Sequence, residues 1–255
     1  MTRAPALFLG HGSPRLALTD TAASAGWAEA AARYPVPSAI VCISAHWECK
    51  GVLVTRNPVQ RAIHDFYRMP PELYEIEYAP LGDPDLALEI EAMLARYKAR
   101  ADLDSWGLDH GAWMVLRFMY PGADVPTLQL SMDVRRTPEE HFAIGRALRT
   151  LRDRGVMILG SGNIVHNLRV DDPRNGNYPW ARQFDDAVVA ALAQGSRAGL
   201  ANWAALPGAA EAVPESEHFL PLLYVLGASH DGEIPRIFNR AIEGAVSMTC
   251  VAFED

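Results

Sequence analysis

The feature that most constrains the fold is a regular alternation of short apolar runs with longer segments of helical periodicity. The apolar runs end abruptly in glycine or polar turn residues, which is typical of buried strands. They cover residues 6–9, 39–43, 127–131, 156–159 and 247–253. The helical segments cover residues 84–100, 138–154 and 180–193, with Asp83 and Thr137 as candidate caps of the first two. This order predicts an α/β fold whose sheet is mixed or mostly parallel and carries helices on both faces.

The chain has 255 residues, and 49% of them are hydrophobic, which is enough for a substantial core. We see no internal repeat or linker, so we expect a single catalytic domain over residues 1–255. Two segments, 57–82 and 171–179, are too long for tight turns and contain aromatic residues. They are candidate loops over a site.

Charge and cysteine content exclude several classes of function. The net charge of -8 has no acidic or basic block, which argues against nucleic acid or an anionic membrane as the main partner and favours a small molecule. Cys42, Cys49 and Cys250 form no CxxC pair, so we expect buried thiols in a reducing cytoplasm. Neither a signal peptide nor an uninterrupted apolar stretch of about 18 residues is present, which disfavours secretion and membrane insertion.

Four of the eight histidines occupy similar places in the predicted fold. His11, His46 and His166 each follow a predicted strand, and His218 precedes the apolar run 219–226. A lone histidine after a strand is usually a hydrogen-bonded structural residue. Three after successive strands favour a shared metal site, because strand ends of one sheet converge, and active sites of α/β proteins form at the C-terminal ends of strands. A site made mainly of histidine suits zinc, ferrous iron, manganese or nickel.

The other histidines allow two interpretations each. His110 is equally a proton donor at the site and a structural cap of a helix over 111–119, and His64 is equally a substrate contact and a surface residue. His141 lies among glutamates in a predicted helix, so we expect it to be solvated. His230 precedes an Asp-Gly pair and is expected in a turn.

A set of motifs in fixed order resembles a known family. GHGSP, SAHWE, IHDFYRMPPELYEIEYAPLGDPDLA, WGLDHGAWMVLRFMYPGADVPTLQLSMD, SGNIVHNLR and EHFLPLLYVLGA together resemble the 4,5-DOPA extradiol dioxygenases, which are class III ring-cleaving enzymes related to protocatechuate 4,5-dioxygenase. The resemblance extends from His11 to Gly227, so it is far more specific than any one motif.

The resemblance implies roles for individual residues. His11, His46 and His218 match the family's metal ligands, and His166 matches a fourth histidine that is a ligand when zinc is bound and otherwise suits acid–base work. His110 matches a further active-site histidine. The family often has PEHYLP around its last histidine, whereas Ser216 precedes Glu217 and His218 here, which changes the nearby loop.

Extradiol cleavage needs a metal with open positions for both catechol oxygens and for dioxygen, so we expect one divalent ion, ferrous iron for activity, with zinc plausible as the bound ion. His166 is the first choice for the acid–base group and His110 the second. The backbone of residues 160–163 is a candidate oxyanion donor. The candidate substrate contacts, several of them equally expected in the core, are His64, Trp47, Phe66, Tyr67, Trp113 and Asn163.

Other functions fit some of these features. A zinc-dependent hydrolase or lyase could use four histidines and an open water position. Tetrapyrrole chelatases also carry a GHGS-like motif after an N-terminal strand, but SAHWE and HNLR have no counterpart there. A metal-binding protein of the same fold without turnover is the non-enzymatic alternative. The residues do not specify the catechol, the physiological metal or the oligomeric state.

Overall fold

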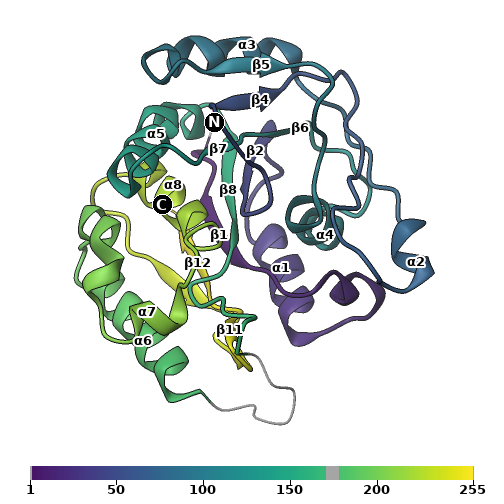
Figure 1. Cartoon of the computed structure of the whole chain (residues 1–255). Coiled ribbons are helices and arrows are strands. Elements are labelled where there is room, and N and C mark those ends of the chain that lie inside the picture. The colour runs from purple at the N-terminus through teal and green to yellow at the C-terminus, as the bar shows by residue number, and fades with distance from the viewer. Residues whose placement is uncertain (1, 171–177, 255) are drawn as a thin grey trace.

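The computed structural model describes residues 2–170 and 178–254 and contains a six-stranded central sheet (Figure 1). In spatial order its strands are β6 (Thr127–Gln129), β2 (Ala39–Ser44), β8 (Val156–Gly162), β1 (Ala6–Gly10), β12 (Cys250–Phe253) and β9 (Arg236–Phe238). The first four are parallel to one another, whereas β12 is antiparallel to both β1 and β9. The predicted mixed, mostly parallel sheet is confirmed.

Helices cover both faces of this sheet, as predicted. Because side chains alternate along a strand, Leu7 and Phe8 of β1 enter different cores. Phe8 joins the core beneath α5 (Pro138–Arg152), α6 (Pro179–Ala193) and α8 (Leu220–Ala228). Leu7 joins the core beneath α1 (Ala22–Ala32) and α4 (His110–Met119). Strands buried on both faces explain why the sequence showed continuous apolar runs and not alternating ones.

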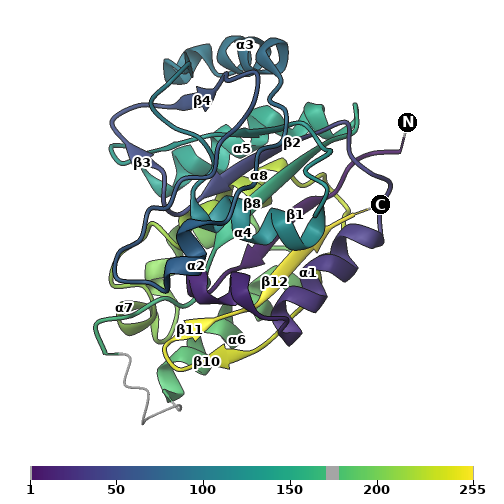
Figure 2. The ribbon, with the colours of Figure 1, turned by 90° about the vertical axis from the view of Figure 1, so that its right-hand side faces the viewer.

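A smaller layer lies beyond the β6 edge of the sheet, where α3 (Pro84–Met93) packs against the parallel pair β4 (Leu53–Thr55) and β5 (Arg100–Asp102) (Figure 1). Figure 2 shows α3 and β4 in this layer from the side. The remaining helical segments are η1 (Pro14–Leu18), α2 (Pro71–Tyr74), η2 (Ala95–Tyr97), η3 (Ala198–Ala205) and α7 (Ala209–Ala212). The remaining strands form the pairs β3 (Glu48–Cys49) with β7 (Met132–Asp133), and β10 (Ile242–Glu243) with β11 (Val246–Ser247).

Several predicted boundaries are wrong. The helix predicted over 84–100 ends at Met93, because Leu94 leaves the helical conformation (φ -99°, ψ 18°). The short helix η2 follows and ends at Lys98, which adopts a left-handed conformation (φ 58°) before the chain enters β5. The strand predicted over 247–253 is divided between β11 and β12. The strand predicted over 127–131 ends at Gln129. Loop 57–82 contains only the short helix α2, and most of the other predicted loop, residues 171–177, lies outside the described residues.

The caps that were predicted for α3 and α5 are present. Asp83 accepts a hydrogen bond from the backbone N–H of Leu86, and Thr137 forms a reciprocal capping box with Glu140. Within residues 2–170 and 178–254, no helix combines the length and apolar character needed to cross a membrane.

Candidate active site

Five imidazoles gather at the C-terminal end of the parallel strands. His11 directly follows β1, His46 lies two residues beyond β2, and His166 lies in the segment after β8. His110 is the first residue of α4, and His218 lies two residues before α8. Residues that are far apart in sequence therefore meet because their strands are neighbours in one sheet.

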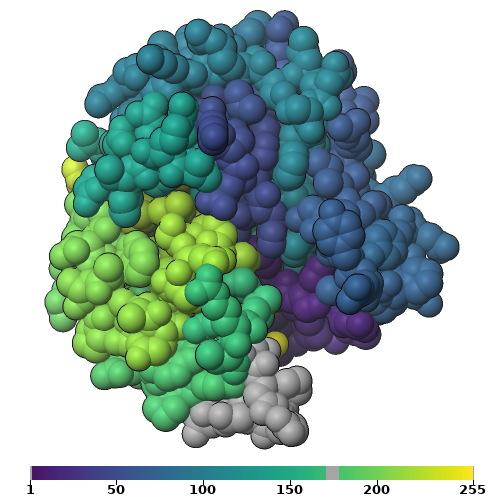
Figure 3. All heavy atoms as spheres, viewed as in Figure 1, coloured from purple at the N-terminus to yellow at the C-terminus, as the bar shows by residue number. Residues whose placement is uncertain are grey.

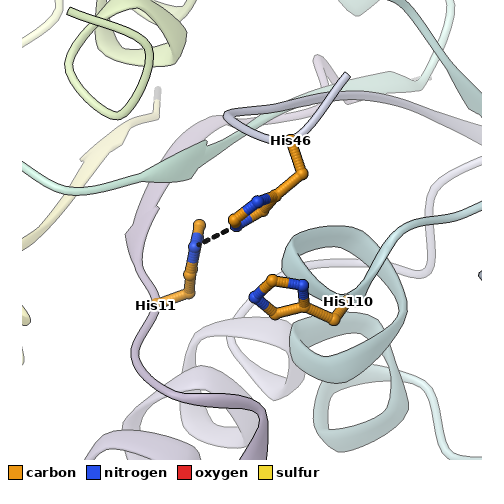
Figure 4. Close-up of side chains that lie close together, drawn as sticks. All are labelled: His11, His46 and His110. Carbon is orange, nitrogen blue, oxygen red and sulfur yellow. Dashed lines mark hydrogen bonds between the residues drawn. The ribbon is translucent and has the colours of Figure 1, made fainter. Parts of the chain in front are cut away.

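Three of these rings have similar separations. The ring centres of His11 and His46 are 5.1 Å apart, those of His11 and His218 are 5.4 Å apart, and those of His46 and His218 are 5.1 Å apart. The Nε2 atoms of His11 and His46 face each other at 3.0 Å (Figure 4). An ion bound by two such nitrogens at about 2.1 Å and at right angles would hold them about 3.0 Å apart. The donor set therefore fits a divalent metal.

The other two imidazoles lie closer to their neighbours. The ring centre of His110 is 3.9 Å from that of His46, and His166 stacks on His218 at 3.4 Å with an interplanar angle of 10°. Judged by ligand atoms within 4.8 Å of one another, the described residues offer two groups, one of His11, His46 and His110 and one of His166, Glu217 and His218. Neither group contains His11, His46 and His218 together, so that set is supported by the similar separations of its ring centres and not by this criterion.

Hydrogen bonds orient His11. The Ser161 hydroxyl lies 2.9 Å from His11 Nδ1 and donates to the carbonyl of Gly111 at 2.6 Å. Because its only proton goes to Gly111, Ser161 accepts from His11 Nδ1–H. This arrangement fixes the tautomer and leaves the lone pair of Nε2 free to bind a metal.

Carboxylates lie beside three of the other rings. Asp65 Oδ2 is 2.9 Å from His110 Nδ1 and 3.6 Å from His46 Nδ1, while Asp65 Oδ1 accepts from the backbone N–H of His110. Glu217 Oε1 is 3.0 Å from His218 Nδ1. Carboxylates on the far nitrogen are the usual partners of metal-binding histidines.

Burial keeps most of these imidazoles neutral. It lowers the pKa of His46 to about 3 and that of His166 to about 4, and it lowers the pKa values of His11 and His218 well below their ordinary value. Nearby imidazoles lower the pKa values of His11, His46 and His218 further. For Asp65, burial raises the pKa, but hydrogen bonding and charge interaction with His110 and His46 outweigh it and the net pKa is lowered. Neutral imidazole is the form that binds metals.

The five imidazoles line one cavity of about 570 Å³, a size typical of small-molecule sites. Its lining consists of His11, Gly12, Ser13, Pro14, His46, Phe66, Met69, His110, Asn163, His166, Leu168, His218, Glu243, Gly244, Val246 and Met248. These residues come from both the N-terminal and C-terminal parts of the chain, which meet near the centre of the face in Figure 3. The cavity therefore exists only in the complete fold.

The candidate substrate contacts are divided between the cavity and other places. Phe66 and Asn163 line the cavity. The other four candidates lie elsewhere. Trp47 is buried against Trp106, and Trp113 is buried in the core, where it donates to the carbonyl of Ile63. His64 contacts the carbonyl of Ile76, and Tyr67 is 88% exposed. Aromatic character alone could not separate a cavity wall from the core or the surface.

Asn163 connects the segments that carry the histidines. Its side-chain Nδ2 donates to the carbonyls of His11 and Ser247, and its backbone N–H donates to the carbonyl of His218. Of the backbone donors predicted over residues 160–163, the Asn163 N–H is therefore not available for an oxyanion, since it is already used within the protein.

His141 is not solvated as predicted. It is buried between α5 and α8, where its Nδ1 lies 2.9 Å from the Tyr224 hydroxyl. The prediction relied on the glutamates that precede His141, but those lie in the exposed first turn of α5, and the helix turns His141 toward α8. His230, by contrast, precedes the turn formed by Asp231 and Gly232, as expected.

Sequence reasoning missed the residues that orient the histidines, namely Asp65, Ser161 and Glu217. Asp65 lies in an irregular loop 45 positions from His110, so no local pattern marks it. Ser161 lies in the GSGN motif and Glu217 precedes His218, so adjacency to the predicted site was a usable signal for both.

Comparison with known proteins agrees with this geometry. The model of the family described as the catalytic LigB subunit of aromatic ring-opening dioxygenase matches residues 6–247. A relative from Escherichia coli (strain K12) named 4,5-DOPA dioxygenase extradiol is 44% identical over 257 residues, which cover 98% of this chain and 94% of the relative. A relative of the same name from Beta vulgaris is 35% identical over 246 residues, which cover 94% of this chain and 92% of the relative.

A solved structure also matches the whole fold. The crystal structure of an uncharacterized protein from Escherichia coli K12 has a TM-score of 0.83 and 38% sequence identity, and the match covers 98% of this chain and 100% of that one. Since the family model spans nearly the whole sequence and the relatives align over almost their full length, the chain belongs to the LigB family of aromatic ring-opening dioxygenases.

Proposed function

We propose that the protein is an extradiol dioxygenase that opens the ring of a small catechol, such as DOPA, with dioxygen. The observation that carries this proposal is the convergence of His11, His46 and His218 on a cavity large enough for one aromatic substrate. The relatives named 4,5-DOPA dioxygenase extradiol support the substrate class. We take residues 1–255 as one catalytic domain, because the cavity lining extends from His11 to Met248.

We assign His11, His46 and His218 as the ligands of one divalent metal. When imidazoles bind one ion at about 2.1 Å and at octahedral or tetrahedral angles, their ring centres lie about 4.5 to 5.3 Å apart. The two separations of 5.1 Å fall within this range and the 5.4 Å of His11 and His218 lies just above it, whereas the 3.9 Å of His46 and His110 and the 3.4 Å of His166 and His218 are too short.

Iron(II) is the metal that this reaction requires. When bound, it supplies open positions for both catechol oxygens and for dioxygen and passes electron density between them, which redox-inactive zinc does not do. The product then contains every atom of the catechol and both atoms of dioxygen. Zinc binds the same imidazoles, so it competes for the site without supporting turnover.

His166 and His110 are the candidates for moving protons. His166 lines the cavity, and burial lowers its pKa to about 4, so it is neutral but a weak base. Its assignment as the group that takes a proton from a catechol hydroxyl therefore rests on its place in the cavity. His110 is held by Asp65 through both its ring and its backbone, so it is suited to a fixed position against the substrate. We assign the acid–base role to His166 first and to His110 second. A cytoplasmic location accords with the three free cysteines.

The proposal is tested by loading metal-free protein with iron(II) under anaerobic conditions, adding a catechol and then admitting dioxygen. We expect one dioxygen consumed per catechol and a yellow semialdehyde that absorbs in the visible, while zinc-loaded protein shows neither. Protein that retains iron yet consumes no dioxygen with any catechol would instead be a metal-binding protein without turnover.

A further inference from the structure

The cavity has an asymmetric set of charged groups. Apart from the five imidazoles, Glu243 is its only ionisable lining residue within residues 2–170 and 178–254, and no lysine or arginine of this part of the chain lines it. Among the described residues, a substrate that enters therefore meets a carboxylate and no fixed cation. The charge of the cavity lining therefore affects which catechol the site accepts.

The other carboxylates close to the histidines already have partners. Asp65 is engaged by His110, Glu217 by His218, and Glu215 by Arg169. No hydrogen bond or ion pair to a described residue occupies the carboxylate of Glu243, which is exposed. Of these four acids, Glu243 is the one free to meet a ligand.

The backbone around Glu243 is well fixed. Glu243 pairs with Val246 across the β10–β11 hairpin, in which Gly244 takes a positive φ of 61°. Val246 in turn bridges His166, and the backbone N–H of Asn167 donates to the carbonyl of Ala245. The hairpin is thus attached to the segment that carries His166, which holds Glu243 at a defined side of the cavity.

The walls suggest how a catechol lies. Its two oxygens belong at the histidines, and the apolar side chains of Phe66, Val246 and Met248 are available to contact its ring. Glu243 lines the same cavity as the histidines, so a ring substituent that points away from them has this exposed carboxylate to meet. A carboxylate at that place attracts a protonated amine and repels a carboxylate.

We propose that Glu243 binds a protonated amine on the ring substituent, so that the enzyme selects amine-bearing catechols over catechols whose substituent carries only a carboxylate. This inference rests on the proposed function, because it places the catechol oxygens at the metal ligands. Since Glu243 is exposed, the expected effect is modest, about 5-fold in affinity.

A set of catechols that differ in charge tests the proposal. The compounds are 4-(2-aminoethyl)catechol, which is a cation, 4-ethylcatechol, which is neutral, and 3,4-dihydroxyphenylacetate, which is an anion. For each we would measure kcat/KM with iron-loaded protein and Kd with zinc-loaded protein, which binds without turnover. The variants are Glu243→Gln, Glu243→Lys and, as a control of equal charge change on the exposed surface of α1, Glu29→Gln.

We expect the unsubstituted protein to prefer the cation over the neutral compound and the neutral compound over the anion, in both Kd and kcat/KM. Glu243→Gln should weaken binding of the cation about 5-fold and leave the Kd of 4-ethylcatechol unchanged. Glu243→Lys should invert the order of preference. Glu29→Gln should change none of these constants. Equal losses for all three compounds in Glu243→Gln would overturn the proposal and indicate a structural role. Turnover of 4-ethylcatechol without a preference for the amine would overturn this inference alone, whereas no turnover of any catechol would overturn the proposed function as well.

Discussion

At the scale of single residues, metal binding depends on the partner of the ring nitrogen that faces away from the cavity in each histidine. Ser161 engages Nδ1 of His11, Glu217 engages Nδ1 of His218, and Asp65 lies 3.6 Å from Nδ1 of His46. Such partners fix the tautomer and leave Nε2 as a ligand. His11, His46 and His166 could be chosen from the sequence because they follow predicted strands, and His218 because it precedes an apolar run and matches the family motif. Asp65 could not, because it comes from a loop without periodicity.

Replacement of His11, His46 or His218 by alanine should remove the bound metal, because two imidazoles alone do not hold a divalent ion tightly. Replacement of His166 by alanine should retain the metal and lower kcat far more than it raises KM. Metal analysis of the four purified variants, with kinetics on the fourth, checks both parts. A full complement of metal in the first three would show that the ligand assignment is wrong.

Ser161→Ala should weaken metal binding about 10-fold without removing a ligand, because His11 loses the partner that fixes its tautomer. Competition with a chelator measures the metal affinity. Ser105→Ala is the matched control, since Ser105 is exposed and its hydrogen bonds go to nearby Asp102, away from the cavity lining. Equal affinity in both variants would mean that Ser161 does not orient His11.

At the scale of elements, close contact between α4 and the strand ends restricts what α4 can carry in its first turn. A Cβ atom on Gly111 would lie 2.5 Å from Ser44 Oγ, 2.9 Å from His46 Cδ2 and 3.2 Å from His11 Cε1. Glycine is otherwise a poor helix residue, so its presence here reflects the space taken by the two imidazoles.

Gly111→Ala should therefore lower metal affinity by at least about 10-fold, although alanine favours the helix by about 1 kcal/mol. Gly122→Ala is the control, because a Cβ there meets nothing closer than 3.6 Å. Chelator competition and thermal unfolding of both variants separate an effect on the site from one on stability. Unchanged metal affinity in Gly111→Ala would show that the histidines move aside without cost.

The contact of α5 with α8 carries a buried titratable group, His141. Burial lowers its pKa to about 4, whereas in the unfolded chain it is near 6.5. Between these values the unfolded chain binds more protons, so the free energy of unfolding falls as pH falls from 6.5 toward 4. The contribution of His141 to the free energy of unfolding should be about 2 kcal/mol smaller at pH 5 than at pH 8.

His141→Gln, whose amide can still accept a hydrogen bond from Tyr224, should unfold with a shallower pH dependence than the unsubstituted protein. Denaturant unfolding of both at pH 5 and pH 8 gives the difference, and all other titrating groups are common to the two proteins. Parallel pH profiles would contradict a neutral buried His141.

At the scale of the whole molecule, sequence reasoning recovered the class of fold and the place of the site better than the connections between strands. Runs buried on both faces revealed β1, β2, β6, β8 and part of β12, and their C-terminal ends located the histidines. The antiparallel pairing of β12 with β1 and β9 was not predictable, because β9 is only three residues long and half-buried. Pairing depends on contacts between distant segments, which local periodicity does not encode.

The segments that carry His11, His46 and His218 meet only after the whole sheet has formed, and the position of the metal shows whether these three residues are its ligands. Crystals of iron-loaded protein, measured on both sides of the iron absorption edge, would locate the ion by anomalous scattering. We predict one peak about 2.1 Å from the Nε2 atoms of His11, His46 and His218. A peak within either of the other two groups, at His110 with His11 and His46 or at Glu217 with His166 and His218, would contradict the assignment.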